Sequence, residues 1–164
     1  MRAATEADLE GLNDLYNEYV QTAHYTFDVE PMTIDARREW FSHYGTTGRH
    51  RVFVASASGR VVGYSSSSRY RLKEAYETSV ETSVYLVPEA TGMGVGTKLY
   101  TELFHSLRGQ DVHRAYAGIS LPNPGSVALH EKFGFKRAGL YTEQGRKFGK
   151  YWDVAWFEKA LSDS

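Results

Sequence analysis

The fold of this chain is decided by residues 80–100, which read Val80-Glu81-Thr82-Ser83-Val84-Tyr85-Leu86-Val87-Pro88-Glu89-Ala90-Thr91-Gly92-Met93-Gly94-Val95-Gly96-Thr97-Lys98-Leu99-Tyr100. The segment begins as an apolar-rich run typical of a strand and stops at Pro88. A glycine-rich turn follows. Beyond it, apolar residues recur at helical spacing at Val95, Leu99, Leu103, Phe104 and Leu107. The pattern predicts a strand, a tight glycine turn and a helix.

The glycine turn has the features of a phosphate site. The first turn of a helix presents unpaired backbone N–H groups, and the helix dipole favours an anion there. Gly92, Gly94 and Gly96 lack a Cβ, which lets a phosphate approach the main chain. Their spacing does not match the dinucleotide pattern G-x-G-x-x-G, and Gly-Thr-Lys stands where a P-loop needs Gly-Lys-Ser/Thr. We predict a pyrophosphate cradle at residues 92–97, the alternative being a flexible turn before a helix.

Composition is that of an ordinary soluble domain with a core. The chain has 164 residues, of which 41% are hydrophobic and 24% charged, with a formal net charge of −1. A net charge this small gives no general electrostatic footprint for nucleic acid, so we expect no such partner. No apolar run approaches the ~20 residues of a membrane span, and residues 1–6 lack the apolar core of a secretory signal. We therefore expect no membrane partner.

The sequence contains no cysteine. Disulfides, cysteine-based zinc sites and a cysteine nucleophile are thereby excluded, and the composition fits a cytoplasmic enzyme. Five of the six histidines show no metal-ligand spacing and are interpreted as structural or surface residues, so we expect no metal. These are His24, His43, His50, His105 and His113.

Local patterns predict the other elements. Strands are expected at residues 2–4, 51–57, 60–70, 113–119, 136–141 and 150–161. Helices are expected after a capping box at residues 5–8, from the cap Thr33, from Val95 to near Gly109, and over residues 126–133. The helix after Thr33 is expected to bury Ile34, Trp40, Phe41 and Tyr44. The order β-α-α-β-β-β-α-β-α-β-β predicts an α+β domain with a mixed, mostly antiparallel sheet flanked by helices.

Two blocks carry a resemblance to a known family. Residues 91–96 resemble Gln/Arg-x-x-Gly-x-Gly/Ala, the acetyl-CoA signature of the GNAT superfamily of N-acetyltransferases, with Thr91 in place of the leading Gln/Arg. Residues 123–135, Asn-Pro-Gly-Ser-Val-Ala-Leu-His-Glu-Lys-Phe-Gly-Phe, resemble a second block of that family. The resemblance extends over nearly the whole chain, and it implies a GNAT-like fold and one N-acetyltransferase domain over residues 1–164.

A closer resemblance is to the phosphinothricin and methionine-sulfoximine N-acetyltransferases. It is carried by residues 2–8, 80–86, 97–101, 121–123 and 149–154. It implies direct transfer of an acetyl group from acetyl-CoA to the amine of a small amino-acid analogue, such as phosphinothricin, methionine sulfoximine or methionine sulfone, with detoxification as the role. Relatives of this kind tend to be homodimers, which makes a homodimer the expected state.

The resemblance also implies which residues bind acetyl-CoA. The strand before the cradle would pair its backbone with the pantetheine arm, at Val84, Tyr85 and Leu86. The pyrophosphate would lie against Gly92, Met93, Gly94, Val95, Gly96 and Thr97. Asn123 would contact the arm beyond it.

Attack on a thioester needs a free amine lone pair, whereas an α-ammonium, with a pKa of about 8, is mostly protonated at neutral pH. A base is therefore required. Glu81, in an otherwise uncharged strand, matches the glutamate that resembling enzymes use as base, the alternative being an exposed residue or an arginine partner. His130 stands where such enzymes place the donor of a proton to the leaving thiolate, and it equally fits a histidine that only contacts CoA.

An acidic amino-acid acceptor needs cations, and Arg71 and Lys73 stand in the segment where resembling enzymes bind substrate. The expected acceptor contacts are Arg71, Leu72, Lys73 and Tyr76 of this segment, together with Glu81. A solvated basic loop is the alternative, and Glu74 and Glu77 dilute its charge. Phe27, in the loop between the first two expected helices, is expected to cap the acceptor pocket, the alternative being ordinary core packing. Two other functions remain open: acetylation of a polyamine, aminoglycoside or protein N-terminus, and a catalytically silent acyl-CoA-binding module. Arg71 and Lys73 argue against a cationic acceptor.

Overall fold

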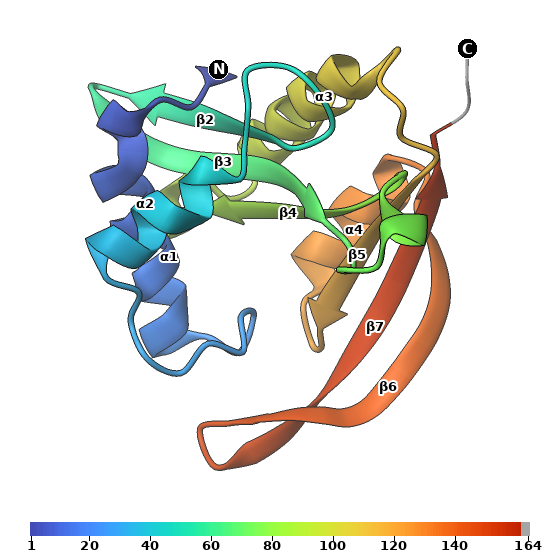
Figure 1. The fold of residues 1–164 in the computed structure, drawn as a ribbon. Coiled ribbons are helices and arrows are strands. Elements are labelled where there is room, and N and C mark those ends of the chain that lie inside the picture. The colour runs from blue at the N-terminus through green and yellow to red at the C-terminus, as the bar shows by residue number, and fades with distance from the viewer. Residues whose placement is uncertain (162–164) are drawn as a thin grey trace.

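A computed structural model describes residues 1–161, which form a seven-stranded sheet with helices packed on it (Figure 1). The order of strands in the sheet is β1-β2-β3-β4-β5-β7-β6. The helices and strands are β1 (Arg2–Ala3), α1 (Leu9–Thr22), α2 (Ile34–Ser42), β2 (Arg51–Ala57), β3 (Arg60–Arg69), β4 (Ser79–Leu86), α3 (Val95–Leu107), β5 (Arg114–Ser120), α4 (Pro124–Lys132), β6 (Lys136–Lys147) and β7 (Lys150–Ala160), with single 3-10 turns η1 (Glu6–Asp8), η2 (Glu74–Tyr76) and η3 (Pro88–Ala90).

The predicted element order and the mixed, mostly antiparallel sheet are confirmed. Every neighbouring pair of strands is antiparallel except β4 and β5. The two predicted N-terminal caps are also present. Asp8 completes a capping box with Thr5, and the Thr33 hydroxyl accepts a hydrogen bond from the backbone N–H of Ala36.

Three expectations need correction. Ile34 is exposed rather than buried, because the first turn of α2 turns Arg37 inward, where its guanidinium lies over the rings of Tyr16 and Trp40. Strand β6 continues to Lys147, six residues past the predicted end, because its pairing with β7 resumes after a bulge. Helix α4 begins at Pro124 and not at residue 126.

Two apolar layers cover the two faces of the sheet. Successive residues of β3 show the alternation, since the side chain of Tyr64 packs in the layer under α1 and α2 while the Ser65 hydroxyl donates to the carbonyl of Leu99 in α3. The α3 layer holds the larger cluster, including Leu99, Leu103 and Phe135. The sheet is thus fixed from both sides, which holds its central strands in register.

The central strands β4 and β5 diverge about halfway along their length. Parallel pairing between β4 and β5 covers only Ser79–Glu81 against Arg114–Tyr116. Beyond Glu81, β4 stays with β3 and β5 stays with β7, so the two strands diverge (Figure 1). Their facing backbone edges are left without a ladder, and this opening holds the candidate site.

Candidate active site

A cavity of about 890 Å³ lies in the opening between β4 and β5. Its walls are residues 82–86 of β4, residues 117–120 of β5, the turn and first residues of α3, the inner side of α4, and the end of α1. A site of this volume is in the range of a small-molecule pocket. The unpaired edge of β4 gives it a row of backbone groups able to hydrogen-bond an extended ligand.

The glycine turn forms one end of this cavity. Gly92 and Gly94 have φ of +77° and +78°, a conformation that favours glycine, and a Cβ on either would meet nothing within 4 Å. Gly94 is the N-cap of α3, so the free N–H groups of that helix begin here. Gly96 has a different reason to be glycine, because a Cβ there would lie 3.3 Å from Cδ2 of Leu129 on α4.

Most residues predicted to bind the acyl donor line the cavity. They are Val84, Tyr85, Leu86, Gly92, Gly94, Val95, Gly96, Thr97 and Asn123. Met93 does not line it, and its side chain is 71% exposed. Asn123 also caps α4 by accepting a hydrogen bond from the backbone N–H of Ser126 at 3.2 Å.

Sequence reasoning missed a cation at the glycine turn. Lys132, on the last turn of α4, lines the cavity, and its Nζ lies 3.3 Å from Oγ1 of Thr97. An ammonium beside the N-terminus of α3 adds to the attraction of that helix end for an anion. Only the packing of α4 against α3 brings it there, since the two residues are 35 positions apart.

Helix α1 supplies a further wall that sequence reasoning missed. Glu18, Tyr19 and Thr22 line the cavity, and the Tyr19 hydroxyl donates a hydrogen bond of 2.6 Å to the carbonyl of Leu86. The rings of Tyr19 and Tyr85 meet edge to face, with centroids 5.4 Å apart. No local pattern in the sequence shows which edge of the sheet this helix reaches.

Glu81 is the last residue of β4 that pairs with β5, where it lies opposite Tyr116, and on its other side it pairs with Ser68 of β3. Its side chain is half-buried, and burial raises the pKa of its carboxyl, with Arg71 opposing that shift. Glu81 does not line the cavity itself, but Thr82, the next residue, does. A carboxyl with a raised pKa at the point where the strands part has the chemistry of a proton acceptor.

His130 lines the cavity from α4 but is held in the core. Its side chain is 3% exposed, with Nδ1 2.7 Å from the carbonyl oxygen of Ser126 and Nε2 2.7 Å from the hydroxyl of Tyr100. The Tyr100 hydroxyl also lies 3.2 Å from Oγ1 of Thr82 in the β4 wall. Burial lowers the pKa of His130, which favours the neutral imidazole.

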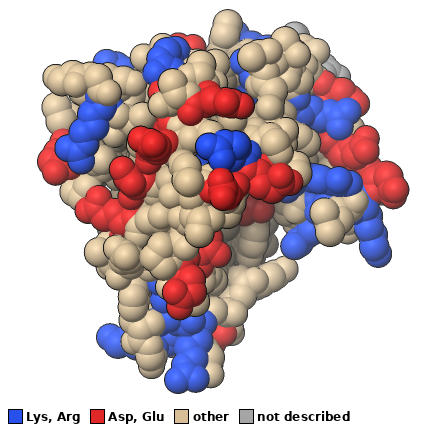
Figure 2. Space-filling model, turned by 60° about the vertical axis from the view of Figure 1, so that its left-hand side comes forward, with Lys and Arg blue, Asp and Glu red and all other residues tan. Residues whose placement is uncertain are grey.

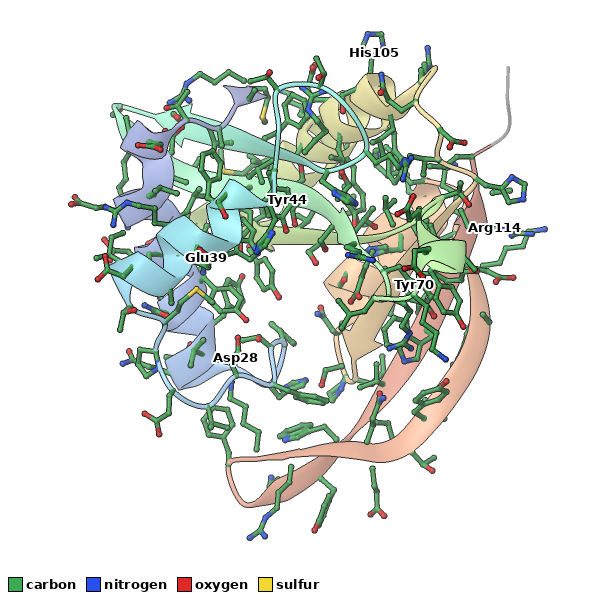
Figure 3. The ribbon with its side chains drawn as sticks, viewed as in Figure 1. Asp28, Glu39, Tyr44, Tyr70, His105 and Arg114 are labelled. Carbon is green, nitrogen blue, oxygen red and sulfur yellow. The ribbon has the colours of Figure 1, made fainter. Side chains whose placement is uncertain are left out.

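The predicted acceptor segment lies beside Glu81 rather than in the cavity. The guanidinium of Arg71 lies over the ring of Tyr70, 4.8 Å from its centroid, and Tyr70 (labelled in Figure 3) stacks in turn on Tyr116 of β5, with ring centroids 4.5 Å apart. Tyr76 meets Tyr70 edge to face. The side chains of Leu72 and Lys73 are exposed. The structure therefore brings Arg71 near Glu81 and leaves Leu72 at the surface.

Phe27 lies in the loop between α1 and α2, against β6. A Cβ on Gly145 would overlap its ring, so this glycine permits the close approach. Neither Phe27 nor any predicted acceptor residue lines the cavity. On the surface, acidic and basic side chains are interspersed over most of the face seen in Figure 2, in keeping with the small net charge.

A family model for the acetyltransferase (GNAT) domain matches residues 1–156. The chain belongs to the GNAT acetyltransferase family. It is 51% identical over 163 residues to a phosphinothricin N-acetyltransferase from Streptomyces coelicolor, covering 98% of this chain and 95% of that one. It is 31% identical over 161 residues to an L-methionine sulfoximine/L-methionine sulfone acetyltransferase from Pseudomonas paraeruginosa, covering 98% and 94%.

A solved GNAT structure has the same fold. The phosphinothricin acetyltransferase of Sinorhizobium meliloti in complex with AcCoA superposes with a TM-score of 0.93 at 33% identity, covering 99% of this chain and 88% of that one. This GNAT chain is therefore an N-acetyltransferase, and acetyl-CoA is its acyl donor. The cavity fits such a donor, because it joins an open glycine turn at a helix N-terminus to an unpaired strand edge.

Residues 1–161 offer neither a metal site nor a membrane-spanning helix. No group of three or more His, Asp or Glu side chains is placed to hold a metal ion among these residues. No helix in this part of the chain is long and apolar enough to cross a membrane.

Proposed function

We propose that this GNAT enzyme acetylates the amine of a small amino-acid-like acceptor of the phosphinothricin, methionine sulfoximine or methionine sulfone kind, with Glu81 as general base. The observation that carries the proposal is the position of Glu81. Its half-buried carboxyl, with a raised pKa, stands where β4 and β5 part, next to the cavity wall and within electrostatic reach of Arg71. The acceptor class is supported by the names of the relatives, which act on such amino-acid analogues.

Acetyl-CoA supplies, when bound, an acetyl group already activated as a thioester. We assign its phosphates to the free N–H groups after Gly94, with the ammonium of Lys132 beside them. The pantetheine arm is assigned to the unpaired edge of β4 at Val84, Tyr85 and Leu86. This assignment is supported by the continuous cavity that joins the two places.

Glu81 would take the proton that an acceptor ammonium must lose before it can attack. An α-ammonium has a pKa of about 8, so a base of raised pKa is well matched to it near neutral pH. Arg71 then has two effects. It favours the charged carboxylate of Glu81, and its guanidinium suits the acid group of an amino-acid acceptor.

His130 is assigned a supporting part. Because Nδ1 faces the Ser126 carbonyl and Nε2 faces the Tyr100 hydroxyl, both ring nitrogens already have partners. Direct donation of a proton from His130 to a thiolate would break one of these bonds. The neutral ring instead orients Tyr100, whose hydroxyl is next to Thr82 in the cavity wall.

We also propose that the protein acts in the cytoplasm as a homodimer. The lack of cysteine is in keeping with that compartment. Exposed apolar side chains on the β6–β7 hairpin, namely Leu140, Tyr141, Phe148 and Tyr151, offer area for a second copy. Light scattering after size exclusion would give twice the chain mass for a dimer and the chain mass alone if this is wrong.

A thiol-release assay with acetyl-CoA tests the function. The acceptors are phosphinothricin, methionine sulfoximine, methionine sulfone, spermidine and a peptide. Release with one of the three amino-acid analogues supports the proposal, and release with spermidine or the peptide alone contradicts it.

The base is tested by Glu81→Gln with Glu102→Gln as control, since Glu102 is exposed on α3. We expect the first to lower kcat by about 10²–10⁴-fold and the second to leave it unchanged. Protection by CoA against thermal unfolding should remain in both variants. Unchanged turnover in Glu81→Gln would show that Glu81 is not the general base.

A further inference from the structure

A buried cation joins the loop that follows α1, residues 23–28 (the 23–28 loop), to the β6–β7 hairpin. Lys147, the last residue of β6, is 3% exposed, and its ammonium donates to the carbonyl oxygens of Ala23 and Thr26, both at 2.8 Å. The Phe148 ring lies 5.1 Å from the same nitrogen. A lysine ammonium is costly to bury, so these two bonds compensate a charge that would otherwise stay in water.

Two further contacts join the same parts. The His24 ring stacks on Trp152 of β7, with centroids 4.0 Å apart and planes 3° apart. The indole N–H of Trp152 donates to the backbone carbonyl of Lys147 at 2.9 Å, so this hydrogen bond links the two residues that contact the loop. Figure 1 shows the end of the hairpin reaching toward the loop that follows α1. The contacts thus fix the loop from one side along most of its length.

The 23–28 loop also borders the acyl-donor cavity. Ala23 and Tyr25 line it, while Lys147 does not. His24 Nε2 lies 3.0 Å from the carbonyl oxygen of Pro122, directly before Asn123 in the cavity wall. At its far end, Asp28 accepts a hydrogen bond from the hydroxyl of Tyr16 on α1, and Figure 3 places Asp28 in this loop. The loop therefore reaches from the end of α1 toward the connection between β5 and α4. It covers one side of the opening between β4 and β5.

We propose that Lys147 is a positioning residue for acetyl transfer, holding the 23–28 loop as the wall past which the acceptor enters. The proposal rests on the proposed function only for the acceptor used in the assay. An ammonium outside the cavity would then control how well the acceptor binds, because the loop that it holds carries Phe27, which we expect to cap the acceptor pocket, together with Ala23 and Tyr25, which face the cavity. Loss of the ammonium would release the loop without touching the glycine turn or β4.

The test compares Lys147→Met, Lys147→Arg and Lys150→Met. Methionine keeps an unbranched side chain one atom shorter and removes the N–H donors, whereas arginine keeps a cation with N–H donors. Lys150 is exposed at the other side of the same hairpin turn and serves as the matched control. We expect Lys147→Met to raise the acceptor KM about tenfold while kcat and the KM for acetyl-CoA change by less than about twofold. Lys147→Arg should recover most of the acceptor affinity, and Lys150→Met should match the parent.

Hydrogen exchange gives a readout that does not depend on turnover. In Lys147→Met, backbone amides of residues 23–28 should exchange faster while those of α3 keep their protection. Faster exchange throughout the chain, or kcat and both KM values changed together, would mean that Lys147 serves stability alone and would overturn the proposal. So would an acceptor KM equal to that of the parent.

The two proposals fail in different ways. If the parent enzyme acetylates none of the three amino-acid analogues, the proposed function is wrong, and the KM comparison is made with whichever amine of the panel is turned over. The exchange comparison still decides whether Lys147 holds the loop. If the parent acetylates an analogue and Lys147→Met does so with the same KM, only the positioning role is wrong.

Discussion

The hydroxyl of Tyr100 lies 2.7 Å from Nε2 of His130, joining α3 to α4 through the core. Because Nδ1 of the same ring faces the Ser126 carbonyl at 2.7 Å, that nitrogen carries the proton, and Nε2 accepts from the tyrosine. Burial raises the pKa of Tyr100 and lowers that of His130, so both groups stay neutral. The pair is a buried polar contact whose two members depend on each other.

Tyr100→Phe should therefore destabilise the protein. The substitution leaves Nε2 of His130 and the hydroxyl of Thr82 without a partner in the core, which costs about 1–3 kcal/mol. Thermal unfolding measures the loss as a lower Tm. Tyr151→Phe is the control, since Tyr151 is exposed, and equal Tm values for the two variants would contradict this account.

Glu81 should reduce stability at neutral pH. Burial raises the pKa of its carboxyl in the folded state, with Arg71 opposing, so the folded protein holds this proton more tightly than the unfolded chain. Below the unfolded pKa, both states are protonated and there is no penalty. As the pH rises toward the folded pKa, the penalty grows. We expect Glu81→Gln to have a higher Tm than the parent at pH 7, with the difference fading as the pH falls below about 4. A Tm difference between Glu81→Gln and the parent that grows as the pH falls would contradict this prediction.

The same carboxyl should shape the pH profile of the reaction. Only the ionised form accepts a proton, so kcat/KM should fall as the pH decreases through the raised pKa of Glu81. Glu81→Gln should lack this acidic limb in its residual activity. An acidic limb retained in the variant would assign the titration to another group, such as the acceptor amine.

Gly94→Ala should weaken CoA binding. A side chain at φ +78° is strained by about 1–2 kcal/mol, and its methyl would stand in the open space above the glycine turn. Gly109→Ala is the matched control, because Gly109 has φ +71° and equally open surroundings but lies after α3, away from the cavity. Both variants should lose stability, and only Gly94→Ala should raise the Kd for CoA in a calorimetric titration. Equal Kd values would place the nucleotide elsewhere.

Gly145→Ala should displace the 23–28 loop. Its methyl would overlap the Phe27 ring, at an expected loss of about 1–3 kcal/mol, whereas Gly139→Ala in the same strand meets nothing within 4 Å. Adding Gly145→Ala to Phe27→Ala should cost much less than adding it to the parent, which a double-mutant cycle of unfolding free energies measures. Additive losses would show that Phe27 and Gly145 do not meet in solution.

Parts of the site that are contiguous in sequence were predictable. The strand of residues 80–86, the glycine turn and α3 follow from a change of apolar period within one segment, and the cap at Thr33 from a single local hydrogen bond. These features depend on neighbours a few residues away, so the sequence carries them directly.

Features that depend on packing between distant segments were not predictable from the sequence. The inward turn of Arg37 in place of Ile34 reflects the aromatic rings that surround it, which come from α1 and α2 together. The length of β6 reflects its partner strand, because polar residues join a ladder when a neighbour offers hydrogen bonds. Neither signal is visible in a local pattern.

By itself, the sequence determined the order of the elements, the glycine turn at the start of α3 and the membership of the GNAT family. Only the tertiary structure decided that Lys132 reaches the glycine turn, that Tyr100 meets His130 and that Lys147 holds the 23–28 loop from 121 residues away. The physical reason is that hydrogen bonds between distant residues exist only after apolar burial has set the helices and strands against one another.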